Sequence, residues 1–544
     1  FYRNSNTASK YDDIICKDLV HSGSPAVYQL NPKKENIGTL KRMILGERDL
    51  TKTNKTILLV GETGAGKSTL INALVNYAMG VKWKDDVWFQ IVEDEKKRSQ
   101  TESQTSDVIV YQIFGFEDKA LPYSLTIIDT PGYGSTEGIE QDVFISQRLL
   151  DLFRSCDGVH EIDAVGLVLK ATESRLSEKQ SYIFDSVASL FGKNMEKNIV
   201  ALVTYSNGRT PKNALTALEA ANVKCARNEK NQPVHFLFDN CQNENRTDDI
   251  DDLKHADKIT TKGMIQFTNF LEKAAPQKLG TTVEVLNERI RLTACIQNLQ
   301  DRVQYIELKH GEIRQTQEAL KKHEEDMKTN VNYTIDVDEV YKDVERIDGG
   351  MWFKVFYEAA VCCKICEENC HYPGCTVAWS PKHCEVMKGG RCTSCTRKCP
   401  ASDHVKEDWK FVNKTRKVQK TLQDVKDKYE KSKADSEKTT SLLEHLKKEI
   451  ANLEADKAKC LEEAYQCVGK LDQIALNVDS LSTYIHLGFL IEKMKEKKDD
   501  KKAQKLEEMA HRISGTFQAG KKYAYEMFCK IFRRNKDGRR GTDV

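Results

Sequence analysis

The fold is decided by the stretch Gly61-Glu62-Thr63-Gly64-Ala65-Gly66-Lys67-Ser68-Thr69. It directly follows an apolar run at residues 56–60 and opens a helical pattern that starts at Lys67. Glycines allow successive backbone N–H groups and a helix N-terminus to point at a bound anion. In this spacing Lys67 is expected to reach the β- and γ-phosphates, and Ser68 is expected to bind Mg²⁺. We therefore predict a phosphate-binding loop formed by all nine residues.

A second motif follows about sixty residues later, where the apolar run 124–128 leads into Asp129-Thr-Pro-Gly132. We expect Asp129 to hold Mg²⁺ through a water molecule and the N–H of Gly132 to sense the γ-phosphate. In the polar stretch between the two motifs, Thr101 is predicted to close on Mg²⁺ when a triphosphate is bound, with Thr105 as the alternative. The predicted Mg²⁺ site is thus made by Ser68, Thr101 and Asp129.

The surrounding sequence alternates short apolar runs with longer amphipathic ones, which is typical of a parallel sheet with crossover helices. We predict an α/β P-loop NTPase domain, a G domain with a mostly parallel sheet, over residues 51–278. The predicted strands are residues 56–60, 108–114, 124–128, 162–170, 198–204 and 234–238, and the predicted helices are residues 67–79, 138–155, 173–190 and 257–273. Residues 1–50 are polar with little periodicity, so we expect an irregular N-terminal arm there.

These motifs resemble those of P-loop GTPases of the septin and AIG1 (immunity-associated) type. The resemblance rests on residues 61–69, the following Leu70-Ile71-Asn72, the stretch around Thr101 and Asp129-Thr-Pro-Gly132, and it covers about residues 55–275. Over most of its length the chain is also similar to large animal proteins that join such a G domain to a Cys-rich coiled coil. The resemblance implies a guanine-nucleotide switch, with GTP or GDP and Mg²⁺ as ligands, that dimerises or polymerises through its G domain.

Two positions depart from the pattern of these GTPases. Their guanine-reading motif is Asn/Thr-Lys-x-Asp, and the equivalent place here reads Thr204-Tyr205-Ser206-Asn207. Asn207 presents a donor where an Asp carboxylate would accept a second time, which should lower guanine selectivity, whereas Tyr205 is expected to stack on the base. Tyr133 stands where many of these GTPases carry a water-positioning Gln, so hydrolysis should be slow or depend on an activating partner.

Beyond Leu279 the sequence has a helical periodicity. Apolar residues step by three and four along residues 279–330, and a second register of this kind runs through residues 405–475. Such stripes need a partner, so we predict an antiparallel coiled-coil hairpin with a cysteine cluster near its tip, although self-association into a dimer would bury the same stripes. Residues 331–361 are predicted to be a strand or extended connector, and residues 476–544 a helical basic tail.

Nine of the 17 cysteines lie between Cys362 and Cys399, inside a predicted Cys/His-rich zinc module at residues 362–404. The spacing Cys-x2-Cys-x3-Cys-x4 occurs twice and ends once in Cys and once in His. Because tetrahedral Zn²⁺ takes four such ligands, we predict two structural zinc ions, with pairing inside or across the repeats both open and a disulfide knot as the alternative. The predicted ligands are Cys363, Cys366, Cys370, Cys375, Cys392, Cys395, Cys399 and His404, and the spare candidates are Cys362, Cys384, His371 and His383.

Overall charge and hydropathy limit the function classes. The chain has 544 residues with 84 Lys and Arg against 82 Asp and Glu, and this balance gives no global case for a nucleic acid or an acidic partner. A basic tail that ends in Arg539 and Arg540 makes contact with a membrane surface or a nucleic acid a minor expectation. No apolar run approaches the length of a membrane span and no signal peptide is visible, so we expect a cytoplasmic protein.

Together these features predict a GTP-binding protein, a slow or partner-activated GTPase that controls self-assembly or partner recruitment through its coiled coil. The expected partners are a second copy of the chain and other proteins. A scaffold with an idle nucleotide site is an alternative because of Asn207 and Tyr133. An ATPase with a zinc-hook coiled coil is a weaker alternative, since no Leu-Ser-Gly-Gly-like signature follows Leu471.

Overall fold

The computed structural model describes residues 17–38, 40–93, 107–132, 139–172, 184, 187–247, 249–322, 334–347, 359–375, 380–421, 442–477 and 481–516. The chain divides into two compact units. The first combines Phe1–Leu286 with Ile474–Tyr484 and Met509–Val544, and the second combines Asn287–Gln473 with Ile485–Glu508. Among the described helices, none is both long enough and apolar enough to cross a lipid bilayer.

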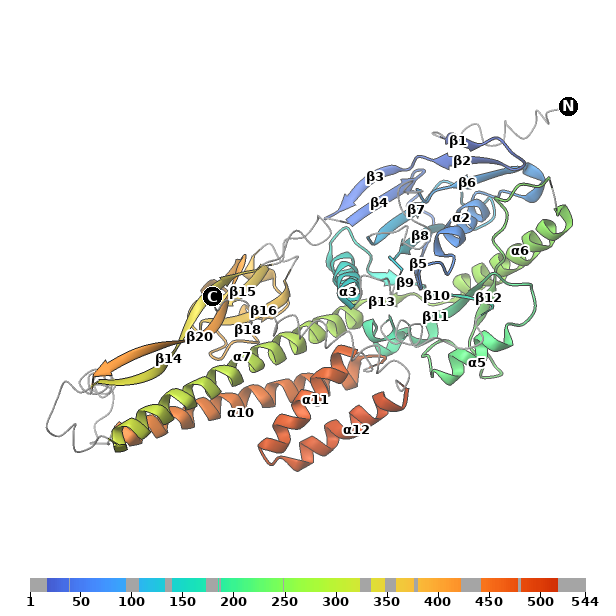
Figure 1. Ribbon diagram of the computed structural model, residues 1–544. Helices are drawn as coiled ribbons and strands as arrows, with labels where there is room; N and C mark the ends of the chain where they lie inside the picture. Colours follow the sequence, from blue (N-terminus) through green and yellow to red (C-terminus); the bar gives the residue numbers. More distant parts are fainter. Residues whose placement is uncertain are drawn as a thin grey trace. The chain divides into compact units, whose positions relative to one another are not determined.

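The first unit is built on an eight-stranded sheet (Figure 1). Five strands run parallel, the next two run in the opposite direction, and the last turns back at the edge. In spatial order the strands are β12 (His235–Leu237), β11 (Ile199–Thr204), β10 (Ala164–Lys170), β5 (Asn54–Gly61), β8 (Ser124–Asp129), β7 (Ile109–Ile113), β4 (Leu40–Leu45) and β3 (Lys33–Ile37). The α/β fold with a mostly parallel sheet is therefore confirmed.

The central strands are apolar along their whole length because both of their faces are covered. In β5, Ile57 and Leu59 join one buried cluster with residues of the flanking helices, and the alternate Leu58 and Val60 are buried on the opposite face. The helices of this unit are α2 (Lys67–Ala78), α3 (Ile139–Arg154), α5 (Lys212–Ala220) and α6 (Ile250–Lys273), with 3₁₀ turns at Trp83–Asp85 and Lys193–Asn198. Most of the predicted helix 173–190 lies outside the described residues.

The irregular arm expected at residues 1–50 is wrong for the part that the structure describes. Strands β4 and β3 extend the main sheet beyond β7, with β4 parallel to β7 and β3 antiparallel to β4. A separate three-stranded sheet pairs β2 (Ala26–Leu30) with β1 (Lys17–His21) and β6 (Val87–Gln90), and β9 (Glu161–Ile162) pairs with β13 (Gln277–Lys278). Edge strands carry polar side chains on their exposed faces, so these segments lack the apolar runs that mark the central strands.

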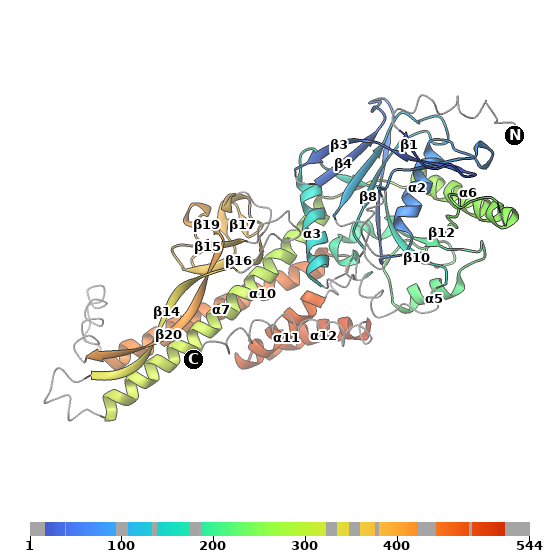
Figure 2. The ribbon, with the colours of Figure 1, turned by 45° about the horizontal axis from the view of Figure 1, so that its top comes forward.

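The second unit contains long helices. They are α7 (Gly280–Lys322), α10 (Leu442–Ile474), α11 (Leu481–Glu496) and α12 (Asp500–Thr516), each of which begins or ends in the first unit. Helices α7 and α10 lie side by side (Figures 1 and 2) and run antiparallel, because Glu288 approaches Lys470 while His310 approaches Glu454. Leu299, Val303 and Ile306, which belong to the apolar periodicity predicted along residues 279–330, are buried in α7.

A long two-stranded ribbon leads into and out of the cysteine-rich region. It pairs β14 (Thr334–Arg346) with β20 (Trp409–Thr421), residue for residue from Thr334↔Thr421 to Arg346↔Trp409. Beyond it, residues 359–407, here called the cysteine module, contain a sheet of β16 (Glu368–Cys375), β15 (Ala359–Cys363) and β19 (His404–Glu407). A small hairpin joins β17 (Met387–Lys388) to β18 (Arg391–Cys392), and 3₁₀ turns lie at Pro381–His383 and Ala401–Asp403.

Two predictions for this region are wrong. Residues 409–421 form a strand, not the start of a second helix, which begins in the described chain at Leu442. The cysteine module also does not lie at the tip of the helix pair: Arg291 Nε donates to Glu385 O at 2.9 Å, so the module packs near the start of α7. The ribbon accounts for both errors, because thirteen extended residues carry the chain roughly 40 Å back along α7.

Candidate nucleotide site and cysteine module

The predicted phosphate-binding loop lies between β5 and α2, at the carboxyl edge of the parallel strands. Helix α2 starts at Lys67, so its first-turn amides have no partners inside the helix and are free in geometry to face an anion. Gly66 precedes the helix at φ 91°, a conformation that side chains with a Cβ rarely adopt. The backbone therefore forms the concave turn that the sequence predicts.

Lys67 is held inside this loop. Its Nζ donates to the carbonyl oxygens of Gly61 at 2.8 Å and Glu62 at 3.3 Å. Burial lowers the pKa of Lys67, and the negative charge of Asp129 acts in the opposite direction. These two carbonyl oxygens are neutral acceptors, whereas a phosphate is charged and accepts a stronger hydrogen bond. The ammonium group of Lys67 can therefore exchange the carbonyls for a bound phosphate.

The second motif lies beside the first because β5 and β8 are neighbouring parallel strands, with Leu59 paired to Asp129. Asp129 is fully buried, and the next residue, Thr130, donates its Oγ1 hydrogen to Leu59 O at 2.9 Å. Gly132 approaches the loop so closely that a Cβ added there would lie 2.2 Å from Thr63 Oγ1. The structure thus brings Asp129 and Gly132 to the phosphate loop, as the sequence predicts.

The residues predicted to read the base follow β11. Thr204 Oγ1 donates to Ala65 O at 2.7 Å, which connects the end of β11 to the phosphate loop. Tyr205 is 56% exposed, and Lys170 Nζ lies 5.5 Å from the centre of its ring. The exposed Asn207 accepts a hydrogen bond from Arg209 N at 3.1 Å through Oδ1. Both side chains are therefore accessible at the same edge of the sheet.

Some predicted site residues lie outside the described part of the chain. Thr101, Thr105 and Tyr133 belong to this group. Asn240, just after β12, was not considered from the sequence, and its partly exposed side chain has a buried Nδ2 with no hydrogen-bond partner among the described atoms. No sequence motif marks Asn240. Knowledge of the strand order would have indicated it, because β12 is the parallel neighbour of β11 and their carboxyl ends lie at the same edge of the sheet.

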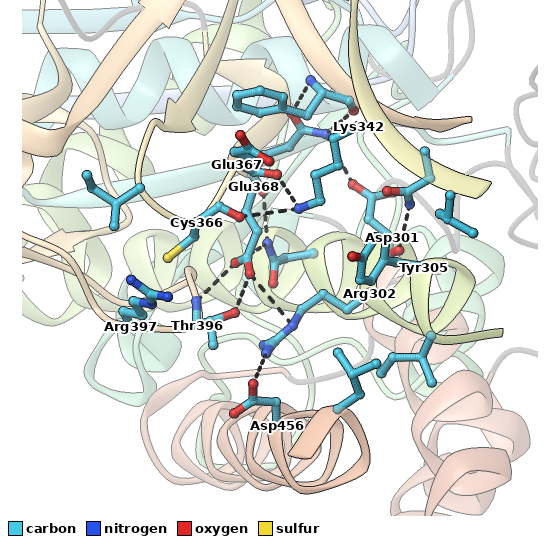
Figure 3. Close-up of a pocket in the computed structure, with 18 of the residues that line it drawn as sticks. Asp301, Arg302, Tyr305, Lys342, Cys366, Glu367, Glu368, Thr396, Arg397 and Asp456 are labelled. Carbon is cyan, nitrogen blue, oxygen red and sulfur yellow. Dashed lines mark hydrogen bonds and ion pairs between the residues drawn. The ribbon is translucent and has the colours of Figure 1, made fainter. Parts of the chain in front are cut away.

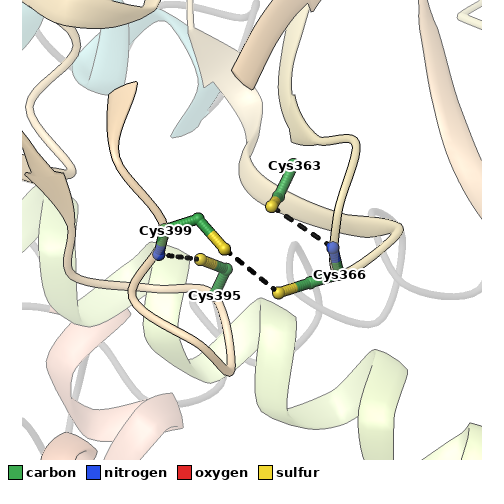
Figure 4. A group of neighbouring side chains, drawn as sticks. All are labelled: Cys363, Cys366, Cys395 and Cys399. Carbon is green, nitrogen blue, oxygen red and sulfur yellow. Dashed lines mark hydrogen bonds between the residues drawn. The ribbon is translucent and has the colours of Figure 1, made fainter. Parts of the chain in front are cut away.

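In the described part of the cysteine module, two groups of four side chains and one group of three bring their ligand atoms within 4.8 Å of one another. Cys363, Cys366, Cys395 and Cys399 form the first group (Figure 4), in which the sulfurs of Cys366 and Cys399 are 3.7 Å apart. In a tetrahedral zinc site with bonds of about 2.3 Å, sulfurs stand about 3.8 Å apart. All fourteen cysteines whose side chains are described are free thiols, and the groups combine residues of both sequence repeats.

The second group consists of Cys370, Cys392, Cys395 and His404, so Cys395 belongs to both. A third group is made by two of the spare candidates and a residue that the sequence did not indicate: His371 Nδ1 lies 3.2 Å from Cys384 Sγ and 3.6 Å from Glu385 Oε2. The other spare candidates, Cys362 and His383, belong to none of the groups found in the described chain.

Next to the first group lies a cavity of about 470 Å³ between α7, β14 and the module (Figure 3). Its wall carries both signs of charge. Lys342 Nζ donates to Cys366 O at 3.3 Å and to Glu367 O, and burial lowers the pKa of Lys342. Glu368 accepts from Thr396 N at 3.0 Å and faces Arg302 at 3.8 Å. These contacts fasten the Cys363–Cys366 turn to the ribbon and to α7.

Comparison with known proteins concerns the first unit. Residues 52–144 match the family model described as Septin. Septin-1 of Drosophila melanogaster is 30% identical over 79 residues, which make up 14% of this chain and 19% of that protein. The chain therefore spans about a fifth of the length of this curated relative.

Solved structures of Toc33 from Arabidopsis thaliana also match. The complex with GDP and Mg²⁺ is 14% identical and aligns over 42% of this chain and 88% of that one, with a TM-score of 0.28. The complex with Mg²⁺ and GMPPNP is 15% identical with the same coverage and TM-score.

The phosphate loop, the neighbouring Asp129 strand and the match to the septin model agree with one another. Residues 52–144 are similar to a septin-type P-loop GTPase domain. The AIG1 subtype stays a prediction.

Proposed function

We propose that residues 51–278 bind GTP with Mg²⁺ and that the bound nucleotide switches the protein between two states. The carrying observation is the buried ammonium of Lys67, which lies in a loop of helix-initiating amides beside buried Asp129. In this proposal residues 61–69 hold the phosphates, while Ser68, Thr101 and Asp129 hold Mg²⁺. Gly132 senses the γ-phosphate, since its backbone already contacts the loop at Thr63.

The base is proposed to lie between the end of β11 and the loop after it. The exposed ring of Tyr205 offers a stacking surface, and Asn207 offers one acceptor to the guanine edge. A preference for GTP over ATP is expected to be smaller than in relatives with Asp at the position of Asn207, because one donor of guanine finds no carboxylate.

The switch is proposed to control self-association through the GTPase domain. The helix pair gives a reason for this choice. Because α7 and α10 approach each other inside one chain, their apolar seams are already covered and need no second copy. The helices and the cysteine module are then available to recruit other proteins.

The cysteine module is proposed to hold zinc in a structural role. Its thiols are close enough to share an ion, and each of the first two groups supplies four protein ligands, which leaves no open position for chemistry there. Several of these sulfurs are fully buried, where a cluster of thiolates without a metal would be costly.

Nucleotide titration of the full chain tests the main proposal. Calorimetry with GTP, GDP and ATP in the presence of Mg²⁺ should show binding, with GTP favoured over ATP. Lys67→Ala should weaken GTP binding at least about 10-fold, because a charge-assisted bond to phosphate is lost. Lys230→Ala is the matched control, since Lys230 is exposed in the turn before β12.

Sedimentation of the same proteins tests the switch. The unmodified chain should change its oligomeric state between GDP and a non-hydrolysable GTP analogue, and the Lys67 variant should not. If GTP binds but the oligomeric state is the same with both nucleotides, the alternative of a scaffold with an idle site is favoured. Absence of binding to any purine triphosphate would refute both.

A further inference from the structure

Seven described side chains surround the two metal positions of the cysteine module, one fewer than two separate four-ligand sites require. The two groups of four share the thiol of Cys395. Either an eighth residue completes one site, or the sulfur of Cys395 serves both ions. Among the spare candidates, His371 and Cys384 belong to the third group, and Cys362 and His383 belong to none of the groups found in the described chain. The remaining candidate for the eighth ligand is Cys375, so the position of its backbone decides between these arrangements.

The strand register places Cys375 away from the second group. On one side of β15, Cys375 pairs with Ala359, and on the other side His404 pairs with Cys363. Four residues of β15 separate these levels, which corresponds to about 13 Å along the strand. A cysteine and a histidine that share one zinc ion have α-carbons at most about 12 Å apart, given ordinary bond lengths. Cys375 and His404 also lie on opposite sides of β15, which adds to the separation.

His404 is oriented as a ligand of the second position. Its Nδ1 donates to Pro400 O at 2.9 Å, which leaves the lone pair on Nε2. Nε2 is buried without a hydrogen-bond partner among the described atoms, and the side chain is only 5% exposed. An outer hydrogen bond of this kind commonly fixes the tautomer of a metal-binding histidine.

The sulfurs are also prepared to carry negative charge. Cys392 Sγ accepts from the amides of Ser394 and Cys395, each at 3.3 Å, and Cys363 Sγ accepts from Cys366 N at 3.3 Å. Cys395 Sγ itself accepts from Cys399 N at the same distance. Amide donors stabilise thiolates, because they bond the charged form.

We infer that the cysteine module holds two divalent zinc-type ions in one cluster, bridged by the thiolate of Cys395. One ion is bound by Cys363, Cys366, Cys395 and Cys399, and the other by Cys370, Cys392, Cys395 and His404. This inference rests on the zinc binding proposed above and adds the shared ligand and the absence of Cys375 from the cluster.

X-ray absorption of the zinc-loaded full chain tests the bridge directly. Two Zn–S bonds of about 2.3 Å that meet near a right angle place the ions about 3.3 Å apart, and a single bridging sulfur allows at most about 4.6 Å. A zinc–zinc vector below this limit, with two zinc ions per chain, is expected. Two zinc ions without such a vector would overturn the bridge and leave zinc binding intact, whereas no bound zinc would overturn both.

Metal content of three variants gives an independent measure. Cys395→Ser should lower the bound zinc by more than one ion per chain, because both ions lose a ligand. Cys375→Ser should keep two, and so should the matched control Cys362→Ser, a buried thiol in neither group. Loss of one ion from each of the Cys395 and Cys375 variants would refute the shared ligand. If Cys395→Ser does not fold, the absorption measurement on the unmodified chain still decides.

Discussion

The guanidinium of Arg148 is buried and paired with Asp107, with 2.7 Å between Nε and Oδ1. Arg148 belongs to α3, which follows the segment that contains Tyr133, and Asp107 precedes β7 and follows the segment that contains Thr101. The pair therefore connects the two chain segments that leave the predicted switch regions. Asp107 lies six residues after Thr101 in the sequence, so a conformational change around Thr101 would reach this ion pair through only a few residues of the chain.

Removal of the carboxylate from this pair should destabilise the first unit. Asp107→Ala removes the hydrogen bond of 2.7 Å between Asp107 Oδ1 and the buried guanidinium of Arg148, and the loss of a hydrogen bond to a charged group typically costs about 1.5–3 kcal/mol. Urea unfolding of the full chain measures the loss. Glu93→Ala, in an exposed pair with Lys34, should change the free energy of unfolding by less than about 1 kcal/mol. Equal effects of the two substitutions would contradict this view.

Gly132→Ala should impair the discrimination between GTP and GDP. The added Cβ would lie 2.2 Å from Thr63 Oγ1 and 2.9 Å from Thr63 N, so the Asp129 loop must move away from the phosphate loop. Affinity for a non-hydrolysable GTP analogue should fall more than affinity for GDP, as measured with fluorescent nucleotides. Gly280→Ala is the control, because a Cβ there meets no atom within 4 Å. A parallel loss for both nucleotides would argue against a γ-phosphate sensor.

Asn207→Asp should raise the preference for GTP over ATP about 10-fold, since a carboxylate accepts both guanine donors and one such bond is worth roughly 1–3 kcal/mol. The turn should be kept, because Asp can also accept from Arg209 N. Competition between GTP and ATP measures the change. Asn228→Asp adds the same charge in a similar turn, where Oδ1 accepts from Lys230 N and Gln232 N, and should leave the preference unaltered.

His486 gives the second unit a dependence on pH. It lies in α11 with Nε2 3.3 Å from Thr293 Oγ1, and burial lowers its pKa to about 4 from an ordinary value of 6.5. Between these values the unfolded chain binds a proton that the folded chain does not bind. The free energy of unfolding should therefore fall as the pH falls from 6.5 to 4, by up to roughly 3 kcal/mol.

Urea unfolding across this pH range, compared with His486→Leu, checks the effect. The variant should lose this part of the slope, while His255→Leu, at an exposed position in α6, should keep it. An identical slope in the His486 variant would assign the pH dependence to other groups.

The parts predicted well are those whose signal is local. Strand β5, the glycine loop and α2 lie within about twenty-five consecutive residues, and each is marked by composition alone. Asp129 was predicted for the same reason, because a buried strand delivers it directly. The edge strand β3 shows the opposite case: Lys33–Ile37 is mostly polar and exposed, and its strand form depends on its pairing with β4.

The errors in the second unit have a related cause. Val418 lies within residues 405–475, which are predicted to be helical, but it pairs with Val337 in a ribbon whose partner strand lies more than sixty residues earlier. Spacing predicted which cysteines and which histidine belong to the cysteine module, yet the combination of Cys363 and Cys366 with Cys395 and Cys399 is set by the folded chain. Neither long-range pairing leaves a trace in short-range periodicity.

The register of the ribbon has a further consequence. Arg346 and Trp409 face each other across a single strand spacing, so everything between them is attached to the rest of the chain at two adjacent points. If residues 347–408 were replaced by a tight hairpin turn, β14 and β20 could still be connected at Arg346 and Trp409, and α7 and α10 would keep their own connections to the ribbon. The cysteine module is thus a covalently self-contained insertion, and its remaining attachments to α7 are side-chain contacts such as that of Arg291 with Glu385.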